Sequence, residues 1–262
     1  GLTFLNNWVL RAEVSNALGK LFVKNVDTNI EEEIKFTDEK VIDPGISLKQ
    51  RDKNTDYILL NYSSPKTQAR SYLYNLKTKE KKLVKEQEIP SGHNPEDYIV
   101  ERLECESHDK RIIPITITRH KRTKIDGSAN LLLYGYGSYG NSMSPGFSST
   151  RFSLINRDII WVTAHIRGGM ERGMKWWKEG KLLNKKNTFE DYISVAKYLI
   201  KKKYTSNGKI IGMGGSAGGL LMGAVVNKSP ELFLGVIMAV PFVDSLTTNL
   251  DHSLPLTVGE FD

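Results

Sequence analysis

Residues 209–219 read KIIGMGGSAGG, a short apolar run followed by a cluster of glycines around one serine. The run from 209 to 213 predicts a strand, and residues 216–227 predict a helix. Between them, residues 214–218 match the pattern G-x-S-x-G, in which a serine lies on a sharp turn from strand to helix. The neighbours must be small because the strand and the helix pass close together. The segment therefore predicts an accessible Ser216 on a strained turn.

The segments upstream and downstream of this turn alternate between strand and helix patterns. Strands are expected at 111–118, 131–134, 159–164 and 236–240, and helices at 148–156 and 188–203. In the second helix, Thr188 and Asp191 resemble a capping box. Alternating strands and helices are typical of a parallel sheet that is covered on both faces. Together with the serine turn, they predict an α/β-hydrolase core within residues 89–262.

Residues 1–88 show short β-hairpins in series with no helical pattern between them. The expected strands pair as 8–14 with 20–26, around a turn at 16–19, and as 56–62 with 69–76. Serial hairpins are typical of propeller blades, and two blades are too few to close a ring. Residues 89–95 contain two prolines and a glycine and mark a boundary. We therefore expect the C-terminal part of a β-propeller over 1–88 and the N-terminal part of a hydrolase domain over 89–262.

The composition excludes several classes of protein. Hydrophobic residues make up 39% and charged residues 26%, which excludes collagen, coiled coil and wholesale disorder. The 37 Lys and Arg are interleaved with 30 Asp and Glu, and no aromatic–basic motif accompanies them, so nucleic acid is not an expected partner. No apolar run reaches the roughly 20 residues that a membrane span needs. Cys105 is the only cysteine, which favours a reducing compartment and hence the cytoplasm.

Two glycine patterns offer a competing interpretation. Residues 212–217 also fit G-x-G-x-x-A, with Asp244 after the next strand, and residues 135–140 spell G-x-G-x-x-G. Both patterns occur in dinucleotide-binding folds. However, that fingerprint normally opens its fold, whereas several strands precede residue 212, and no helix directly follows residue 140. A loop such as 135–140, after an early strand of a hydrolase sheet, is instead where a second oxyanion donor lies.

Four motifs follow one another in a particular order along the chain. They are Leu132–Gly140, Arg167–Gly169 with Glu171, Gly180–Phe189, and Gly214–Asn227. This order resembles the prolyl oligopeptidase family of serine peptidases. Residues 214–224, followed by 240–244, resemble its oligopeptidase B (protease II) branch. The resemblance is strongest from about Leu131 to Asp262.

The resemblance implies a cytosolic serine peptidase that cleaves short peptides after basic residues and uses no metal or organic cofactor. By position, Ser216 is the nucleophile, and the Ala217 amide and the Tyr136 hydroxyl form the oxyanion hole. Glu260 and Asp262 stand where the branch carries acids that recognise the basic side chain. Carboxylates suit bidentate binding of Arg, although two solvated acids are an equally simple interpretation of these residues.

The sequence departs from the family pattern in three ways. Met170 replaces a glycine of an Arg-Gly-Gly-Gly stretch. Ser144 and Gly146 stand where some branch members carry Asp, which argues against a second basic subsite. The third departure concerns the catalytic base, because α/β-hydrolases supply Ser, then Asp or Glu, then His in chain order. After Ser216 the sequence offers one histidine, His252, and an acid commonly stands at that position in the branch.

We therefore interpret the sequence as an internal fragment of an oligopeptidase B-like enzyme that has the nucleophile and lacks the triad Asp and His. A sheet that ended with the strand at 236–240 would have an unpaired edge, and a companion chain could supply the missing strands and residues. Two other interpretations stay open. One is an inactive remnant that keeps only the scaffold, and the other is an esterase or lipase on the same fold.

Overall fold

The computed structural model describes residues 1–47, 53–251 and 253. The chain divides into two compact units. The first comprises Gly1–Glu96 and Ser144–Ser149, and the second comprises Asp97–Met143 and the residues from Thr150 onward. Glu260, Asp262 and His252 lie outside the described residues. None of the described helices is long and apolar enough to cross a membrane.

The first unit consists of two four-stranded sheets in which each strand pairs with the next along the chain. Every pairing within them is antiparallel. The strands are β1 (Leu2–Phe4), β2 (Trp8–Ser15), β3 (Leu18–Asn25) and β4 (Glu31–Glu33), then β5 (Asp43–Ser47), β6 (Tyr57–Ser63), β7 (Arg70–Asn75) and β8 (Lys81–Glu86). Such meanders are the unit of a propeller blade. The predicted turn at 16–19 is shorter than expected, because Asn16 and Ala17 both have positive φ and close the hairpin alone.

Alternating burial along the strands explains the core of the first unit. In β6, Ile58 and Leu60 are fully buried, whereas Tyr57 is exposed. Successive side chains of a strand point to opposite faces, so one face of β6 supplies the core. Leu10 of β2 is fully buried in the same hydrophobic cluster.

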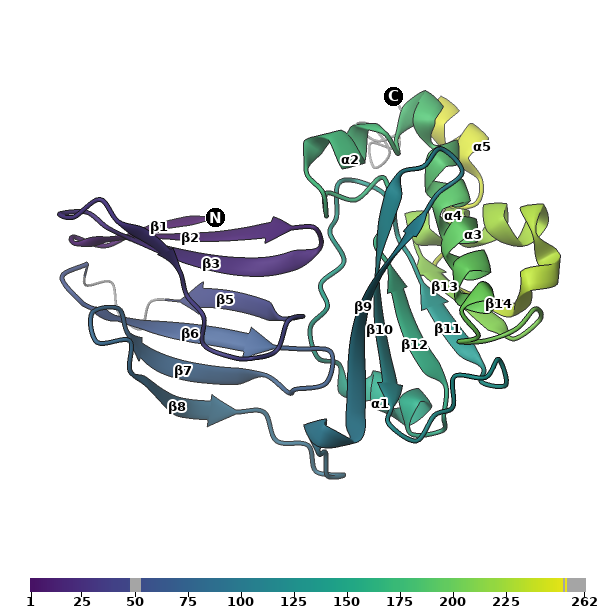
Figure 1. Cartoon of the computed structure of the whole chain (residues 1–262). Helices are drawn as coiled ribbons and strands as arrows, with labels where there is room; N and C mark the ends of the chain where they lie inside the picture. The colour runs from purple at the N-terminus through teal and green to yellow at the C-terminus, as the bar shows by residue number, and fades with distance from the viewer. Residues whose placement is uncertain (48–52, 252, 254–262) are drawn as a thin grey trace. The chain divides into compact units, whose positions relative to one another are not determined.

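The second unit contains a six-stranded sheet in the order β14-β13-β11-β12-β10-β9 (Figure 1). The strands are β9 (Tyr98–Glu106), β10 (Ile112–His120), β11 (Leu131–Tyr134), β12 (Ile160–Ala164), β13 (Ile210–Gly215) and β14 (Phe233–Ala239). From β12 to β14 the pairs are parallel, as predicted. The β9–β10 and β10–β12 pairs are antiparallel, so the sheet is mixed, and β9 was not predicted.

The helices of this unit are α1 (Ser149–Ile155), α2 (Met174–Lys178), α3 (Lys186–Lys201), α4 (Ala217–Lys228) and α5 (Ser245–Leu250). Ile160 and Val162 of β12 belong to the cluster that also holds Tyr192 and Leu199 of α3. Trp161, between them in the strand, lies under the Arg151 guanidinium of α1, 5.1 Å from the ring centre. Because neighbouring residues in a strand face opposite sides, helices cover both faces of the sheet, as the sequence predicts.

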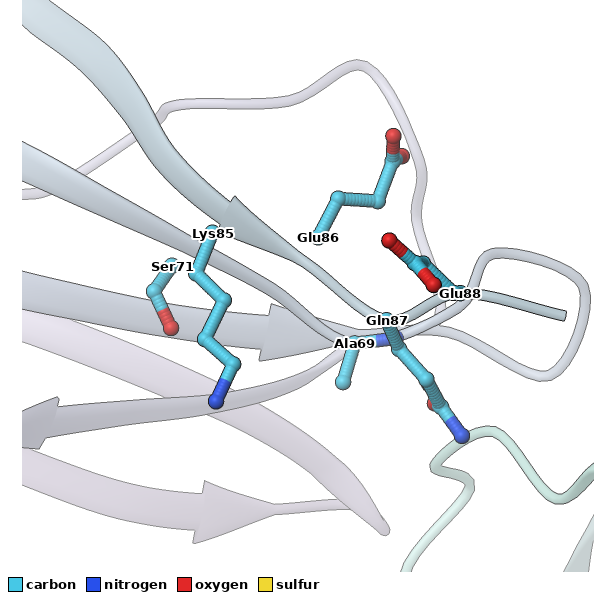
Figure 2. A pocket seen from close by; sticks show the side chains of 6 residues that line it. All are labelled: Ala69, Ser71, Lys85, Glu86, Gln87 and Glu88. Carbon is cyan, nitrogen blue, oxygen red and sulfur yellow. The ribbon is translucent and has the colours of Figure 1, made fainter.

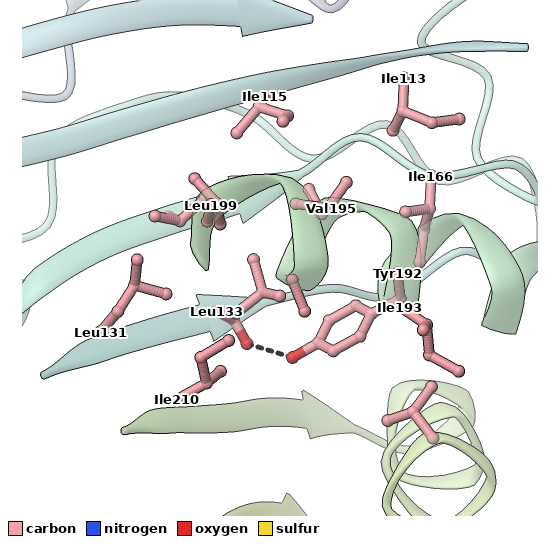
Figure 3. Packing of buried hydrophobic residues seen from close by; sticks show 14 of the residues in the cluster. Ile113, Ile115, Leu131, Leu133, Ile166, Tyr192, Ile193, Val195, Leu199 and Ile210 are labelled. Carbon is pink, nitrogen blue, oxygen red and sulfur yellow. Dashed lines mark hydrogen bonds between the residues drawn. The ribbon is translucent and has the colours of Figure 1, made fainter. Parts of the chain in front are cut away.

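Tyr192 of α3 lies at the centre of this core (Figure 3). Its side chain is fully buried, and its hydroxyl donates a hydrogen bond of 2.6 Å to the Leu133 carbonyl at the end of β11. A Cβ atom at Gly135 would lie 2.9 Å from the Tyr192 ring, so only glycine fits beside it. Tyr192 therefore fixes the place where the chain leaves β11 for the loop that carries Tyr136.

The expected capping box at Thr188 is wrong. Helix α3 begins at Lys186, so Thr188 lies within its first turn rather than at its cap. The Thr188 hydroxyl instead donates to the carbonyls of Arg167 and Gly180, at 2.9 and 3.1 Å. Buried donors must find acceptors, and here the acceptors come from a distant turn that the sequence pattern does not reveal.

Strand β14 is an end strand of the sheet, and among the described residues no strand pairs with its outer side. Leu234 is 61% exposed and Ile237 is 46% exposed. Val240 and Val243, which follow the strand, are exposed as well. This edge agrees with the predicted unpaired edge, and exposed apolar strand edges favour association.

Candidate active site

Ser216 joins the end of β13 to the start of α4 and has φ 53° and ψ −118°. Its amide donates to the Ala239 carbonyl of β14 at 2.9 Å. Its carbonyl accepts from the amides of Gly219 and Phe242, at 2.8 and 2.9 Å. The backbone is thus held on both sides in a conformation that non-glycine residues rarely adopt. The residue itself is exposed, as the motif predicts.

The glycines around Ser216 are required by close packing. A Cβ atom at Gly214 would lie 2.2 Å from the Gly218 carbonyl oxygen, and one at Gly219 would lie 2.5 Å from Pro241 Cα. A Cβ atom at Gly218 would lie 3.0 Å from the Gly135 carbonyl oxygen. The strand, the helix and the loop after β11 therefore pass within backbone contact of one another. The prediction that this turn needs small residues is confirmed.

Ala217 is buried and is the first residue of α4. The first amide groups of a helix have no acceptor within the helix, and the helix dipole places partial positive charge there. An amide at this position suits a negatively charged oxygen that develops next to Ser216. The predicted donor is therefore in a chemically suitable place.

Tyr136 lies in the loop that follows β11 and packs against the start of α4. Its ring carbon Cδ2 would lie 3.4 Å from a Cβ atom built on Gly218. The preceding residue, Gly135, donates its amide to the Met213 carbonyl of β13 at 3.1 Å. The structure thus brings together three of the predicted site residues: Ser216, Ala217 and Tyr136. The other two, Glu260 and Asp262, lie outside the described residues.

The described histidines are His93, His108, His120 and His165. Within the described part of the chain, none of them forms a hydrogen bond with the Ser216 hydroxyl. His165 is fully buried, and its Nε2 lies 2.8 Å from Thr116 Oγ1. Burial lowers the pKa of His165, while Glu171, whose carboxylate lies 3.8 Å from Nδ1, opposes that shift. A neutral, enclosed imidazole of this kind supports the fold rather than the chemistry.

The sequence did not reveal the ion network around Arg167. This buried guanidinium binds Asp191 through Nε at 2.8 Å and Asp109 through Nη1 at 2.6 Å. Burial opposes ionisation of Asp109, but the Arg167 guanidinium holds the pKa of that carboxyl below its usual range. His108, Asp109 and Asp191 are close enough to ligate a metal. Because Arg167 already binds both carboxylates, an ion pair fits the cluster better than a metal.

Two surface hollows are lined by residues other than those of the Ser216 turn. The first, of about 770 Å³, is in the first unit and is lined by Ala69, Ser71, Lys85, Glu86, Gln87 and Glu88 (Figure 2). The second, of about 380 Å³, is lined by residues 122–124, 128–130 and 157–159, which precede β11 and β12. Ser216 instead follows β13, at the carboxyl end of the strands, where α/β sheets bind their ligands. The Ser216 turn is therefore the stronger candidate site.

An exposed serine on a strained turn between strand and helix, with a second candidate oxyanion donor packed against the same helix, is the arrangement of the nucleophile turn in the α/β-hydrolase class. Residues 145–262 match the sequence model of the prolyl oligopeptidase family. That part of the chain belongs to this family, as the motif order predicts.

Curated relatives agree with this assignment. The chain is 42% identical over 263 residues to dipeptidyl aminopeptidase BI of Pseudoxanthomonas mexicana, covering 100% of this chain and 36% of the relative. It is 41% identical over 215 residues to protease 2 of Moraxella lacunata, covering 82% of this chain and 31% of the relative. The chain thus spans about a third of the length of these relatives.

Solved structures also match nearly the whole chain. Oligopeptidase B from Trypanosoma brucei, solved with covalently bound antipain, has a TM-score of 0.91 at 32% identity and covers 99% of this chain and 38% of its own. Oligopeptidase B from Leishmania major has a TM-score of 0.89 at 33% identity, covering 98% of this chain and 37% of its own. The predicted fold, propeller segments followed by part of an α/β-hydrolase core, is confirmed.

Proposed function

We propose that this chain is part of a serine oligopeptidase that cleaves short peptides after Arg or Lys through an acyl-enzyme on Ser216. The observation that carries the proposal is the strained, exposed Ser216 between β13 and α4, with Tyr136 packed against Gly218 at the start of the same helix. The relative named protease 2 and the oligopeptidase B structures support the oligopeptidase B branch. The prolyl endopeptidases among the relatives, such as that of Dictyostelium discoideum at 38% identity, make cleavage after proline the main competitor.

The chemistry follows from the positions of the three residues. Ser216 Oγ attacks the carbonyl carbon of the scissile bond and gives its proton to a base. The carbonyl oxygen becomes an oxyanion that accepts hydrogen bonds from the Ala217 amide and the Tyr136 hydroxyl. The leaving amine takes the proton from the base, and water then hydrolyses the acyl-enzyme. No step uses a metal or an organic cofactor.

The base and its orienting acid come, in this proposal, from residues outside the present sequence. Support comes from the described histidines, which are engaged elsewhere, as His165 is with Thr116. Strand β14 offers the place where further strands of the sheet add, either from a continuation or from a companion chain. We therefore expect residues 1–262 alone to lack peptidase activity.

Specificity is assigned to Glu260 and Asp262 on the sequence resemblance. Paired carboxylates bind the planar guanidinium of Arg through several hydrogen bonds at once. They bind the compact ammonium of Lys less tightly. Residues 1–88 correspond to the C-terminal part of a propeller, and residues 89–262 to the N-terminal part of the peptidase domain. Cys105, a buried free thiol, fits a reducing cytoplasm.

Peptide amides with a fluorogenic leaving group test the substrate class. The chain, mixed with the polypeptide that completes its hydrolase domain, is given amides ending in Arg, Lys, Pro or Ala, and a short acyl ester. The proposal predicts turnover of the Arg and Lys amides at least about tenfold above the others. Preference for Pro would overturn the basic specificity, ester turnover without amide turnover would favour an esterase, and no turnover at all would favour a remnant.

Because one relative is named a dipeptidyl aminopeptidase, each amide is also tested with a free and with a blocked amino terminus. An oligopeptidase cleaves both forms. Turnover restricted to dipeptides with a free amino terminus would contradict the proposed oligopeptidase.

A further inference from the structure

The loop from Gly135 to Met143, which carries Tyr136, contains no helix or strand. Gly137 and Gly140 both have positive φ, at 67° and 66°. A loop of this kind keeps one shape only where outside groups hold it. The Gly140 amide donates to the Gly168 carbonyl at 2.9 Å, and the Met143 amide donates to Glu171 Oε1 at 2.9 Å. These two bonds hold the far half of the loop.

Lys185 holds the near half. Its ammonium donates to the Gly137 carbonyl at 2.7 Å and also to the hydroxyl of Ser138. Ser138 is fully buried, and Lys185 is half-buried directly before α3. Hydrogen bonds from a charged donor are stronger than neutral ones, so this contact is a firm one.

The Gly137 carbonyl depends on Lys185. Among the described residues, no backbone amide donates to this oxygen. The backbone of Gly168 also passes close to this oxygen, since a Cβ atom built on Gly168 would lie only 1.9 Å from it. A buried carbonyl without a donor is costly, so the lysine stabilises this particular path of the chain.

Gly137 directly follows Tyr136 in the chain. Gly135, which directly precedes Tyr136, packs against the start of α4, because a Cβ atom at Gly218 would lie 3.0 Å from the Gly135 carbonyl oxygen. A Cβ atom at Gly218 would lie 3.6 Å from Tyr136 Cα. Tyr136 is therefore held between two fixed points, the start of α4 and the carbonyl that Lys185 binds. A shift of about 1 Å in a group that stabilises the transition state is enough to slow catalysis markedly.

We propose that Lys185 is a positioning residue that fixes the loop carrying Tyr136 relative to Ser216. Its catalytic consequence rests on the proposed function, in which the Tyr136 hydroxyl stabilises the oxyanion. Its structural consequence, a loop held in one shape, does not depend on the function.

Hydrogen exchange measured by mass spectrometry on the full 262-residue chain tests the proposal. Lys185→Met removes the donors, Lys185→Arg keeps a charged donor, and Lys186→Met changes an exposed neighbour as the control. We expect amides of residues 136–141 to exchange about tenfold faster in Lys185→Met, and near the normal rate in Lys185→Arg and Lys186→Met. Exchange within twofold of the unaltered chain in Lys185→Met would overturn the proposal, as would failure of Lys185→Arg to restore it.

If Lys185→Met does not fold, Lys185→Gln carries the test, because it keeps one neutral donor and should give an intermediate rate. A second readout is the rate at which a fluorophosphonate labels Ser216 in the completed hydrolase domain. Lys185→Met should lower that rate about tenfold, and Lys185→Arg should restore most of it. If the unaltered protein is not labelled at all, the proposed function fails, whereas the exchange result still decides the role of Lys185.

Discussion

Ser216 combines a positive φ with a side chain that is not glycine. Such a conformation costs about 1–3 kcal/mol, and it persists where the surrounding structure fixes it. Here the surroundings are the bonds from Ser216 to Ala239, Gly219 and Phe242. The same strained conformation makes the Ser216 hydroxyl accessible, so the energetic cost and the accessibility have one cause.

This strain predicts a difference between two variants that both lack the hydroxyl. Ser216→Gly should be more stable than Ser216→Ala by about 1–2 kcal/mol, because glycine adopts φ 53° freely. Unfolding by guanidinium chloride, monitored by circular dichroism, measures the difference. Equal stability of the two variants would show that the turn is not strained.

His165 predicts a pH dependence of stability. Burial lowers its pKa below the usual 6.5, so the unfolded chain binds more protons than the folded chain as the pH falls below about 6.5. The stabilisation is complete above that pH and is lost as the pH falls toward the folded pKa, with a slope of up to about 1.4 kcal/mol per pH unit. Urea unfolding between pH 5 and 7 measures it.

The matched variants are His165→Gln, in which this slope should largely disappear, and His108→Gln, an exposed histidine, in which it should stay. A slope that survives in His165→Gln would mean that another group causes the pH dependence.

Some residues of the site could be predicted from the sequence and others could not. Ser216 and its glycines form a local pattern, because one turn of chain contains all of them. The partners of Arg167 come from 24 and 58 residues away, and Lys185 reaches Gly137 from 48 residues away. Contacts over such separations depend on the tertiary fold, and a single sequence does not reveal them.

At the scale of elements, the contact between β13 and α4 predicts an unequal response to glycine substitution. Gly214→Ala should destabilise the chain by about 3 kcal/mol, because the new Cβ atom would meet the Gly218 carbonyl at 2.2 Å. Gly223→Ala, within α4, should be neutral or stabilising by about 1 kcal/mol, because its nearest neighbour would be 3.9 Å away. Thermal unfolding of both variants compares them, and a similar loss in each would contradict the close packing.

Strands with a continuous apolar pattern, such as β11 and β12, could be predicted, since their residues are almost all buried. Strand β9 could not, because it mixes residues such as Glu101 and Arg102 with apolar ones and has little periodicity. Its place beside β10 is stabilised by pairs such as Arg119 with Glu101, at 2.7 Å across the two strands. Oppositely charged side chains at the edge of the sheet form ion pairs with each other. Such pairs join two strands and produce no periodic pattern in the sequence of β9 alone.

At the scale of the whole molecule, the exposed edge of β14 predicts association. The purified chain should self-associate at micromolar concentration, because no strand in the described part of the chain pairs with the outer side of β14 and such apolar edges associate readily. Ile237→Lys should shift it toward the monomer, whereas Val14→Lys, at a position 51% exposed in the first unit, should not. Sedimentation velocity measures the change. A monomeric unaltered chain, or equal effects of both variants, would contradict the role of this edge.

The order of motifs along the chain was sufficient to predict the family, and the serial hairpins followed by alternating strands and helices were sufficient to predict the two-part fold. The boundary between the units was harder to define, since residues 144–149 belong to the first unit although the chain around them belongs to the second. Residues 144–149 belong to the first unit because of contacts between residues far apart in sequence. One example is the hydrogen bond of 3.2 Å that the Phe147 amide donates to Ser63 Oγ.

Fluorophosphonate labelling, with the labelled residue identified by mass spectrometry, tests directly whether Ser216 is the nucleophile. The chain is tested alone and after mixing with the polypeptide that completes its hydrolase domain, with Ser216→Ala as the control in both. We expect an adduct on Ser216 in the mixture, none on the chain alone, and none in Ser216→Ala. An adduct on another residue, or one that persists in Ser216→Ala, would contradict the role of Ser216 as the nucleophile. Labelling of the chain alone would contradict the proposal that the catalytic base comes from outside residues 1–262.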